Sequence, residues 1–156
     1  MNSKPLDRHA LGQALTRLAN ASTSDLMRSP QRTLALSAAR RIGLTGAPGA
    51  GKSTLADYLA LHRAPGRRLG ILAIDPSSPR SGGAILGDRI RMDELKGVSQ
   101  LYIRSIGSRS ASDGLSDNLP EMLDLMDEFE FNEVLLETVG VGQVEYAARV
   151  QVDTLV

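Results

Sequence analysis

The hydrophobic positions of this chain follow two spacings, one typical of helices and one typical of buried strands. Leucines recur at helical spacing between residues 11 and 18, which predicts an amphipathic helix over residues 6–20. Residues 21–30 are polar and interrupt the pattern. A second short helix is predicted for residues 31–40, because Pro30 suits the start of a helix. We expect both helices to pack against the rest of the protein rather than to form an arm for a partner.

From residue 41 onward, short apolar runs alternate with amphipathic segments. The runs predict strands at residues 41–46, 68–75, 99–105 and 133–138, followed by a last apolar strand that is still in progress at Val156. The amphipathic segments predict helices at residues 52–63, 88–96 and 117–129. Strands separated by helices of this length imply βαβ units. We therefore expect an α/β fold with a mainly parallel sheet and helices on both faces.

The two patterns divide the chain into a helical extension, residues 1–40, and an α/β domain, residues 41–156. In the helix at 52–63, the side chains expected to face inward are those of Leu55, Leu59 and Ala60. No turn or cap follows the last apolar segment. We therefore expect the chain to be a C-terminally truncated form of a longer protein.

The composition narrows the chemistry that the chain can perform. Eighteen Lys and Arg residues balance eighteen Asp and Glu residues, so the net field that draws proteins to nucleic acid or anionic membranes is lacking. The absence of Cys excludes disulfides and thiolate zinc sites, and two His residues are too few for a His-rich metal site. Any metal should be a hard cation held by oxygen atoms. No apolar run approaches the about 18 residues of a membrane span, and a cytoplasmic protein is the default expectation.

A phosphate-binding motif lies between the first strand of the α/β domain and the next helix. Residues 46–53 read GAPGAGKS and satisfy the pattern G-x-x-x-x-G-K-[ST], beginning at Gly46. Glycines let the backbone wrap closely around phosphate oxygens, and the helix adds its positive N-terminal dipole. Lys52 is expected to reach the β- and γ-phosphates, and Ser53 to bind Mg²⁺. The strand before the motif and the helix after it favour a P-loop NTPase over a glycine-rich turn with a surface lysine.

Three carboxylates are candidates for the same magnesium site. Asp75 and Glu137 fall at the carboxyl ends of predicted parallel strands, where ligands bind in such sheets, and Asp88 follows a polar, glycine-rich loop. Each has an ordinary alternative: a turn residue for Asp75, a helix N-cap for Asp88 and an exposed strand end for Glu137. Magnesium bound to a triphosphate needs one to three carboxylates near Ser53. We therefore favour metal binding over the ordinary alternatives for these three residues taken together.

Two loops have the composition of nucleotide-sensing switches. Residues 76–83, PSSPRSGG, are too polar to form core, and a bound γ-phosphate with Mg²⁺ could order them. The sequence GVGQ, which follows soon after Glu137, has similar freedom, and Gln143 is a candidate for orienting the attacking water. Lys52, Glu137 and Gln143 are therefore the expected catalytic residues.

Three strings carry a resemblance to a known family: GAPGAGKST, AIDPSSPRSGGAILGDRIRM and ETVGVGQVE, in that order. Together they resemble the MeaB/ArgK/MMAA family over residues 6–156. The members are GTPases that accompany adenosylcobalamin-dependent acyl-CoA mutases, and older descriptions call them transport-system kinases. The strings SGGAILGDRIRM and RSIGSR resemble the GTPase domain of fused isobutyryl-CoA mutases about as well.

The resemblance implies GTP as substrate and a role as a chaperone that gates cofactor delivery to a mutase of the methylmalonyl-CoA type and protects it from inactivation. It also implies a homodimer for the full-length protein. The expected metal-associated positions are Ser53, Asp75, Asp88 and Glu137. The segment from Gly49 to Thr54, which includes Ala50, Gly51 and Lys52, is expected to line the phosphates. The Asn-Lys-x-Asp motif that reads guanine lies beyond Val156 in the family, so guanine specificity rests on the resemblance.

Three other functions compete with a mutase-associated GTPase. A P-loop kinase would pass the phosphoryl group to an acceptor other than water. A nickel-insertion GTPase is disfavoured, because that class generally carries Cys and His ligands and this chain has no Cys. A regulatory module would bind nucleotide with negligible turnover.

Overall fold

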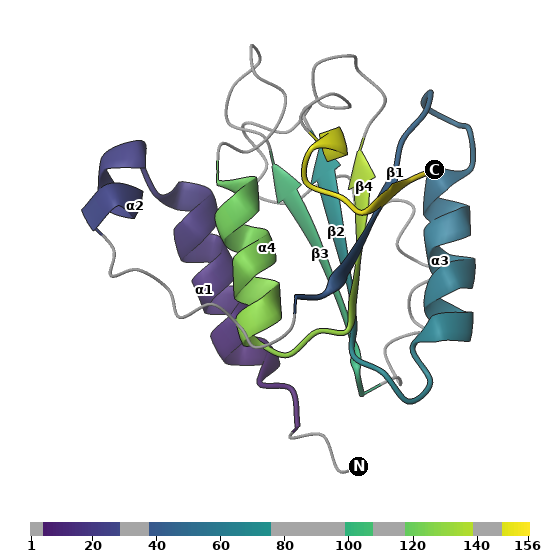
Figure 1. Ribbon diagram of the computed structural model, residues 1–156, viewed down its shortest axis with the longest axis horizontal. Coiled ribbons are helices and arrows are strands. Elements are labelled where there is room, and N and C mark those ends of the chain that lie inside the picture. The colour runs from purple at the N-terminus through teal and green to yellow at the C-terminus, as the bar shows by residue number, and fades with distance from the viewer. Residues whose placement is uncertain (1–4, 29–37, 76–98, 108–117, 139–147) are drawn as a thin grey trace.

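A computed structural model of the chain describes residues 5–28, 38–75, 99–107, 118–138 and 148–156. Its elements, in chain order, are α1 (Arg8–Asn20), α2 (Thr23–Arg28), β1 (Arg40–Leu44), α3 (Lys52–Arg63), β2 (Leu69–Asp75), β3 (Leu101–Gly107), α4 (Leu119–Glu128), β4 (Glu133–Thr138) and β5 (Thr154–Leu155). Figure 1 shows the strands side by side between two layers of helices.

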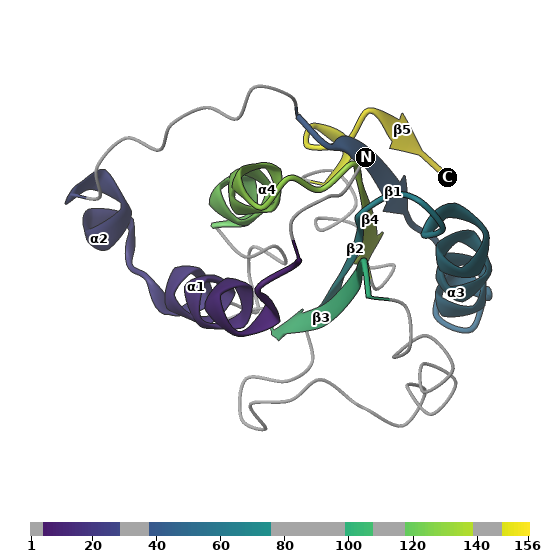
Figure 2. The same cartoon turned by 90° about the horizontal axis from the view of Figure 1, so that it is seen from below.

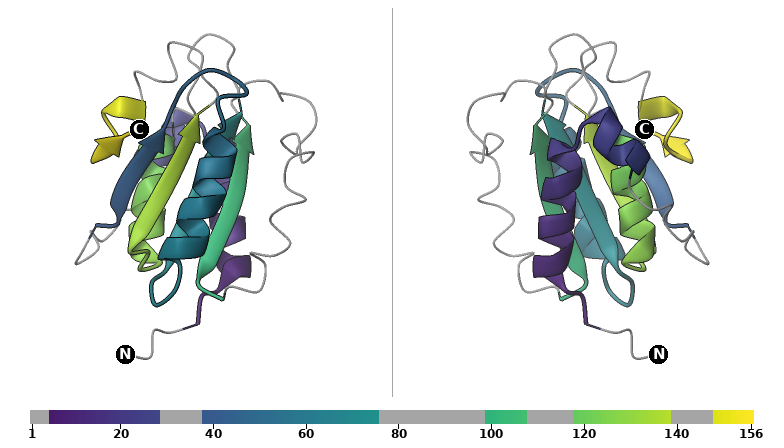
Figure 3. Two further views of the ribbon diagram at one scale, coloured as in Figure 1. Left: turned by 90° about the vertical axis from the view of Figure 1, so that its right-hand side faces the viewer. Right: turned by 90° about the vertical axis from the view of Figure 1, so that its left-hand side faces the viewer.

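The five strands form one parallel sheet in the order β3-β2-β4-β1-β5. β4 lies between β1 and β2, so its residues pair on both sides; Leu136 is opposite Gly43 on β1 and Leu72 on β2. Helices α1 and α4 cover one face of the sheet and α3 covers the other, as Figures 2 and 3 show. The predicted α/β fold with a parallel sheet and helices on both faces is confirmed.

Each face of the sheet has its own hydrophobic core. Leu11, Leu15 and Leu18 of α1 pack with the apolar side of α4 on one face. On the other face, Ala56 and Ala60 of α3 are fully buried against the sheet. Because alanine has only a methyl group, these two positions let α3 lie close to the strands. The helix that follows the phosphate-binding motif is thereby held firmly against the sheet.

The N-terminal helix is fixed to the α/β domain by polar contacts as well as by its leucines. Arg104 of β3 donates hydrogen bonds to the carbonyl of Gly12 at 2.9 Å and to the hydroxyl of Thr16 at 2.7 Å. The amide of Asn118, at the start of α4, donates to the carbonyls of Leu18 and Ala21 at the end of α1. Helix α1 is therefore an integral part of the described fold.

Two predictions about the N-terminal region are wrong. Residues 21–30 were expected to be non-helical, but they contain α2, which begins after a local cap: Ser22 and Asp25 exchange side-chain and backbone hydrogen bonds. These bonds lower the pKa of the Asp25 carboxyl, with the Ser22 hydroxyl as the larger cause.

The helix predicted for 31–40 does not reach its expected end, because Arg40 already belongs to β1. The part of that prediction at 31–37, like the helix expected at 88–96, lies outside the described residues.

The inward face of α3 also differs from the expectation. Ala60 is buried and Leu59 is partly buried as predicted, but Leu55 is 40% exposed, and Ala56 takes the buried position. A helix has about 3.6 residues per turn, so a core contact centred on Ala56 and Ala60 turns Leu55 away from the sheet.

Across the described ranges, no helix is both long and apolar enough to cross a membrane.

Candidate nucleotide site

The loop between β1 and α3 has a backbone shape that requires glycine. Gly46, Gly49 and Gly51 have φ angles of 133°, 80° and 88°, a region that L side chains rarely adopt. The Ala50 amide donates to the Ala47 carbonyl at 3.1 Å, which folds the loop into a tight turn. The backbone conformation therefore requires glycine at these positions. Glycine also lets a phosphate group approach the backbone closely.

The loop ends at the start of α3, and no side chain caps that helix within the described structure. Gly51 is the N-cap residue in the left-handed conformation and has no side chain to offer the first N–H groups. The first N–H groups of a helix have no partner within the helix, and they carry the positive end of the helix dipole. Lys52, Ser53 and Thr54 supply these groups, and Ser53 and Thr54 are exposed. This end of α3 is therefore suited to bind a phosphate group.

The side chain of Lys52 folds back over the loop. Its ammonium group donates hydrogen bonds to the carbonyl of Gly46 at 2.7 Å and to that of Ala47 at 2.9 Å. These contacts hold the positive charge against the loop. An ammonium group has three N–H donors, so it can keep contact with the loop while it binds a phosphate oxygen.

Ser53 meets the carboxylate that was predicted to share its metal. The Ser53 hydroxyl donates to Oε1 of Glu137 at 2.5 Å, although the two residues are 84 positions apart in the chain. The contact exists because β4 lies directly beside β1, with Glu137 opposite Leu44, the residue at which β1 ends before the loop. The structure thus brings together a hydroxyl and a carboxylate at the carboxyl edge of the sheet.

A residue that sequence reasoning missed lies next to this pair. Thr138 is almost fully buried, and its hydroxyl donates to the Leu44 carbonyl at 3.4 Å, which ties the end of β4 to the end of β1. The loop start is held from the other side, where the Thr45 amide donates to the Val156 carbonyl at 2.9 Å. The sequence gives only one indication of this role for Thr138, which is its position directly after Glu137 near the end of a predicted strand.

The remaining predicted site residues are placed only in part. Asp75 is the last residue of β2, so its backbone lies at the same edge of the sheet as Glu137, but its side chain lies outside the described part. Asp88 and Gln143 also fall outside it. Among the described residues, no group of three His, Cys, Asp or Glu side chains is arranged to hold a metal ion. The Ser53 hydroxyl and the Glu137 carboxylate are two oxygen donors of the kind Mg²⁺ prefers, so the pair fits a hard cation.

The opposite end of α3 is anchored by an ion pair. Glu133, at the start of β4, is 2% exposed, and both of its oxygens accept hydrogen bonds from Arg63 at 2.5 Å. The hydrogen bonds, and secondly the charge of Glu133, raise the pKa of Arg63 above its ordinary value. Helix α3 is therefore tied to β4 at both ends, through Ser53 to Glu137 and through Arg63 to Glu133.

A known protein family matches most of this chain. The family described as methylmalonyl Co-A mutase-associated GTPase MeaB matches residues 11–156. The chain belongs to the MeaB family. That family is the one indicated by the motif strings, so the predicted resemblance is confirmed.

Individual relatives fall into three kinds. A probable GTPase of Mycobacterium tuberculosis is 39% identical over 96% of this chain, which spans 46% of the relative. A fused isobutyryl-CoA mutase of Cupriavidus metallidurans is 37% identical over 94% of this chain, which spans 14% of that protein. The crystal structure of a LAO/AO transport system kinase is similar with a TM-score of 0.65 and 27% identity, over 96% of this chain and 44% of the other. The chain thus spans less than half the length of each of these relatives.

Proposed function

We propose that this chain is the phosphate-binding part of a Mg²⁺-dependent GTPase that serves an adenosylcobalamin-dependent acyl-CoA mutase. The observation that carries the proposal is the contact of Ser53 with Glu137 at the end of a glycine-shaped phosphate loop. Membership of the MeaB family and the fused mutase of Cupriavidus metallidurans support the choice of GTP and of a mutase partner.

The chain's own residues would act mainly by positioning and by charge. The loop amides and the first turn of α3 bind the phosphates, and Lys52 stabilises the charge that develops on the β- and γ-phosphate oxygens. Ser53 and Glu137 would hold Mg²⁺, together with Asp75 and Asp88. When bound, Mg²⁺ neutralises phosphate charge. Gln143 orients the water that attacks the γ-phosphate.

Hydrolysis would have a signalling purpose in this proposal. The bound γ-phosphate orders the loops that follow Asp75 and Glu137, and hydrolysis releases them. The mutase contacts the GTPase in only one of the two states, before or after hydrolysis. Cofactor delivery and protection from inactivation are thereby tied to one step of the GTPase cycle. Such a protein acts as a chaperone in the cytoplasm, and the full-length form is a homodimer.

Calorimetry with GTP and with ATP, each in the presence of Mg²⁺, tests the nucleotide assignment. It is performed on this chain and on a form extended to the length of the MeaB relatives, because the guanine-reading motif of the family lies beyond Val156. Preference for GTP in the extended form supports the proposal. Preference for ATP contradicts it and favours a kinase.

The transport system kinase among the structural relatives makes phosphoryl transfer the second candidate. Radiolabelled γ-phosphate distinguishes the two reactions. Release of inorganic phosphate with no labelled acceptor supports hydrolysis, and a rate that rises when the mutase is added supports the chaperone role. A labelled protein or small-molecule acceptor supports the kinase.

A further inference from the structure

Strand β5 supports β1 one residue further along the chain than β4 does. In the described structure, the pairing of β4 with β1 ends at Leu44, opposite Glu137. Strand β5 lies on the other side of β1, at the edge of the described sheet, as Figure 2 shows. The Val156 amide donates to the Gly43 carbonyl at 2.8 Å, and the Val156 carbonyl accepts from the Thr45 amide at 2.9 Å. Thr45, the first residue after β1, is therefore held by the chain segment that contains β5.

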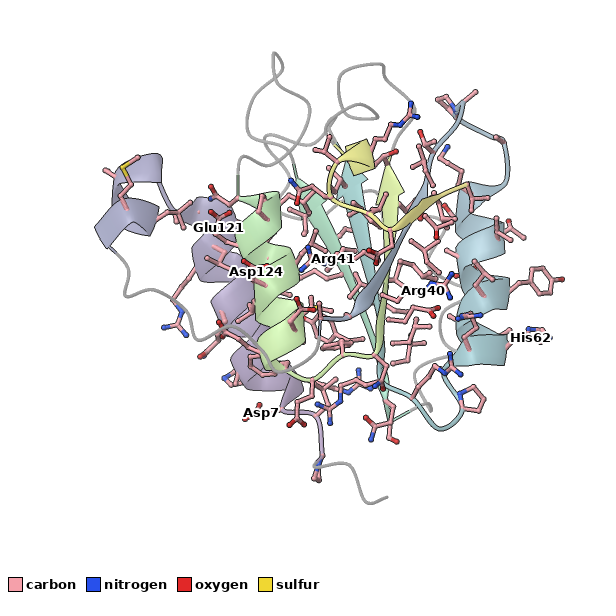
Figure 4. All side chains as sticks on the ribbon, in the orientation of Figure 1. Asp7, Arg40, Arg41, His62, Glu121 and Asp124 are labelled. Atoms are coloured by element: carbon pink, nitrogen blue, oxygen red, sulfur yellow. The ribbon has the colours of Figure 1, made fainter. Side chains whose placement is uncertain are left out.

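The start of this segment is fixed to a rigid point of β1. The Arg41 amide donates to Oδ2 of Asp153 at 2.7 Å, and the Asp153 amide donates to the Arg41 carbonyl at 2.9 Å. The Arg41 side chain extends toward α4, where it pairs with Asp127 at 2.8 Å and with Asp124 at 3.3 Å. Figure 4 shows Arg41 and Asp124 between β1 and α4. The segment therefore begins at a residue of β1 that is itself tied to a helix.

Gly43 keeps the segment close to β1 between these two ends. A Cβ atom at residue 43 would lie 2.8 Å from Cδ1 of Leu155 and 3.2 Å from Cγ2 of Val152. Both distances are shorter than the about 3.5–4.0 Å of an ordinary contact between carbon atoms. The missing side chain at Gly43 thus leaves room for β5 to pack directly on β1.

Thr45 connects this contact to the ammonium group of Lys52. Thr45 is followed by Gly46, whose carbonyl accepts a hydrogen bond from Lys52 Nζ at 2.7 Å. Within the described part of the chain, the Thr45 hydroxyl is buried and has no hydrogen-bond partner, so the side chain adds no polar contact that would fix this residue. A shift of β5 would therefore pass through Thr45 and Gly46 to the Lys52 ammonium group.

We propose that β5 is a positioning element for nucleotide binding. Through its two backbone bonds to β1, Val156 fixes the start of the phosphate loop and thereby the place of the Lys52 ammonium group. The inference rests on the proposed function, because it requires a nucleotide in the loop. Val156 is a positioning residue that acts through its backbone, so nucleotide affinity depends on a strand that supplies no group to the nucleotide.

Two substitutions at residue 156 separate the role of the backbone from that of the side chain. Val156→Pro removes the amide that donates to Gly43, whereas Val156→Ala keeps both backbone bonds and shortens a side chain that is 59% exposed. Both variants are made in the form extended to the length of the MeaB relatives, in which residue 156 lies inside the chain. Affinity for GTP with Mg²⁺ is measured by calorimetry, and the free energy of unfolding is measured by urea denaturation.

We expect Val156→Pro to bind GTP at least roughly fivefold more weakly than the parent, the change expected from the loss of about one hydrogen bond. Val156→Ala should bind as the parent does. The effect of the proline should also depend on Lys52. In a Lys52→Ala background, Val156→Pro should lower the affinity by less than about twofold, because the group that it displaces is already absent. A general loss of structure would lower the affinity equally in both backgrounds.

A second pair of variants decides the question if urea denaturation shows that Val156→Pro does not fold. Asp153→Ala removes the acceptor of the Arg41 amide, and Asp153→Asn keeps an oxygen acceptor at the same place. Asp153→Ala should bind GTP roughly two- to fivefold more weakly than the parent, and Asp153→Asn should restore the affinity. Equal affinity of Asp153→Ala and the parent would contradict the inference.

The outcomes distinguish this inference from the proposed function. If folded Val156→Pro binds GTP as the parent does, or if its effect is as large without Lys52 as with it, β5 does not position the loop and the proposed function stands. If the parent binds no GTP, the proposed function is wrong and the inference falls with it.

Discussion

The Ser53 hydroxyl and the Glu137 carboxylate are joined by a hydrogen bond of 2.5 Å that links the start of α3 to the end of β4. The bond places a strand-end acid beside the phosphate loop, where the proposed Mg²⁺ would bind. It also connects the loop to the penultimate residue of β4. A change in what Ser53 and Glu137 bind would therefore affect both the loop and β4 directly.

Neutralising Glu137 should weaken the response to Mg²⁺. We expect Glu137→Gln to raise the Mg²⁺ concentration that gives half-maximal nucleotide binding by roughly 10- to 100-fold, because the amide keeps the shape but loses the charge. Removal of Mg²⁺ with EDTA should reduce parent affinity more than variant affinity. Glu128→Gln, at an exposed carboxylate on α4, is the control. Identical metal titrations for the parent and Glu137→Gln would show that Glu137 is an ordinary strand-end acid.

The Lys52 side chain should contribute binding energy and little stability. Replacement by alanine removes an ammonium group that is held over the loop by Gly46 and Ala47. We expect nucleotide affinity to fall roughly 10- to 100-fold or more, since a hydrogen bond to a charged group contributes about 1.5–3 kcal/mol. Circular dichroism should be unchanged. The exposed Arg17→Ala on α1 removes one positive charge far from the loop and controls for net charge. Unchanged affinity in Lys52→Ala would contradict the phosphate-loop assignment.

Two glycine substitutions should have opposite effects on the free energy of unfolding. In Gly51→Ala the new methyl group meets no atom within 4 Å, so the only cost is the φ angle of 88°, about 1–2 kcal/mol. In Gly12→Ala the new Cβ lies at an ordinary contact distance of 3.5 Å from the Tyr102 hydroxyl. That position is inside α1, so alanine should stabilise by about 0.5–1 kcal/mol.

Urea denaturation of both glycine variants measures the difference. Nucleotide affinity should fall in Gly51→Ala and stay constant in Gly12→Ala. Equal stability of Gly51→Ala and the parent would mean that the loop backbone adapts to a side chain at residue 51.

The two arginines near Glu133 should differ sharply in their effect on stability. Arg63 makes a two-point contact with this buried carboxylate, and Arg63→Met leaves the charge without its main partner. We expect a loss of about 3 kcal/mol in the free energy of unfolding. Arg67 is half-exposed and 3.9 Å from the same carboxylate, so Arg67→Met should cost less than about 1 kcal/mol. Similar losses in the two variants, measured by thermal and urea unfolding, would show that the ion pair does not anchor α3.

The elements with strong local signals follow from the sequence. The helix predicted for 52–63 has those bounds, and the strand predicted for 133–138 has them too. The helix is marked in the sequence by the glycine-rich loop before it and by its run of helix-forming residues. The strand is marked by an apolar run that follows the polar Asn132. These features act over a few neighbouring residues, so they can be read without the fold. The phosphate loop and its lysine belong to the same class, because the motif is contiguous.

The predictions that failed concern weaker signals. Helix α2 depends on mutual hydrogen bonds between Ser22 and Asp25, in a stretch whose composition reads as polar coil. Leu55 is apolar and was expected to face the core, but the position of α3 on the sheet is set by Ala60 and by Ala56. Ala56 was missed because a small side chain has little weight in a periodicity analysis.

The phosphate loop, the alternation of strands and helices and the residue types available to a metal can all be read from the sequence alone. Which of these residues lie in contact depends on the tertiary structure. The strand order places β4 between β1 and β2, and that order brings Glu137 to Ser53, across 84 residues. The packing of α3 on the sheet through Ala56 and Ala60 also left Leu55 facing outward. The physical reason is that local propensities act within one element, whereas strand order and helix facing depend on how all elements bury their apolar surface together.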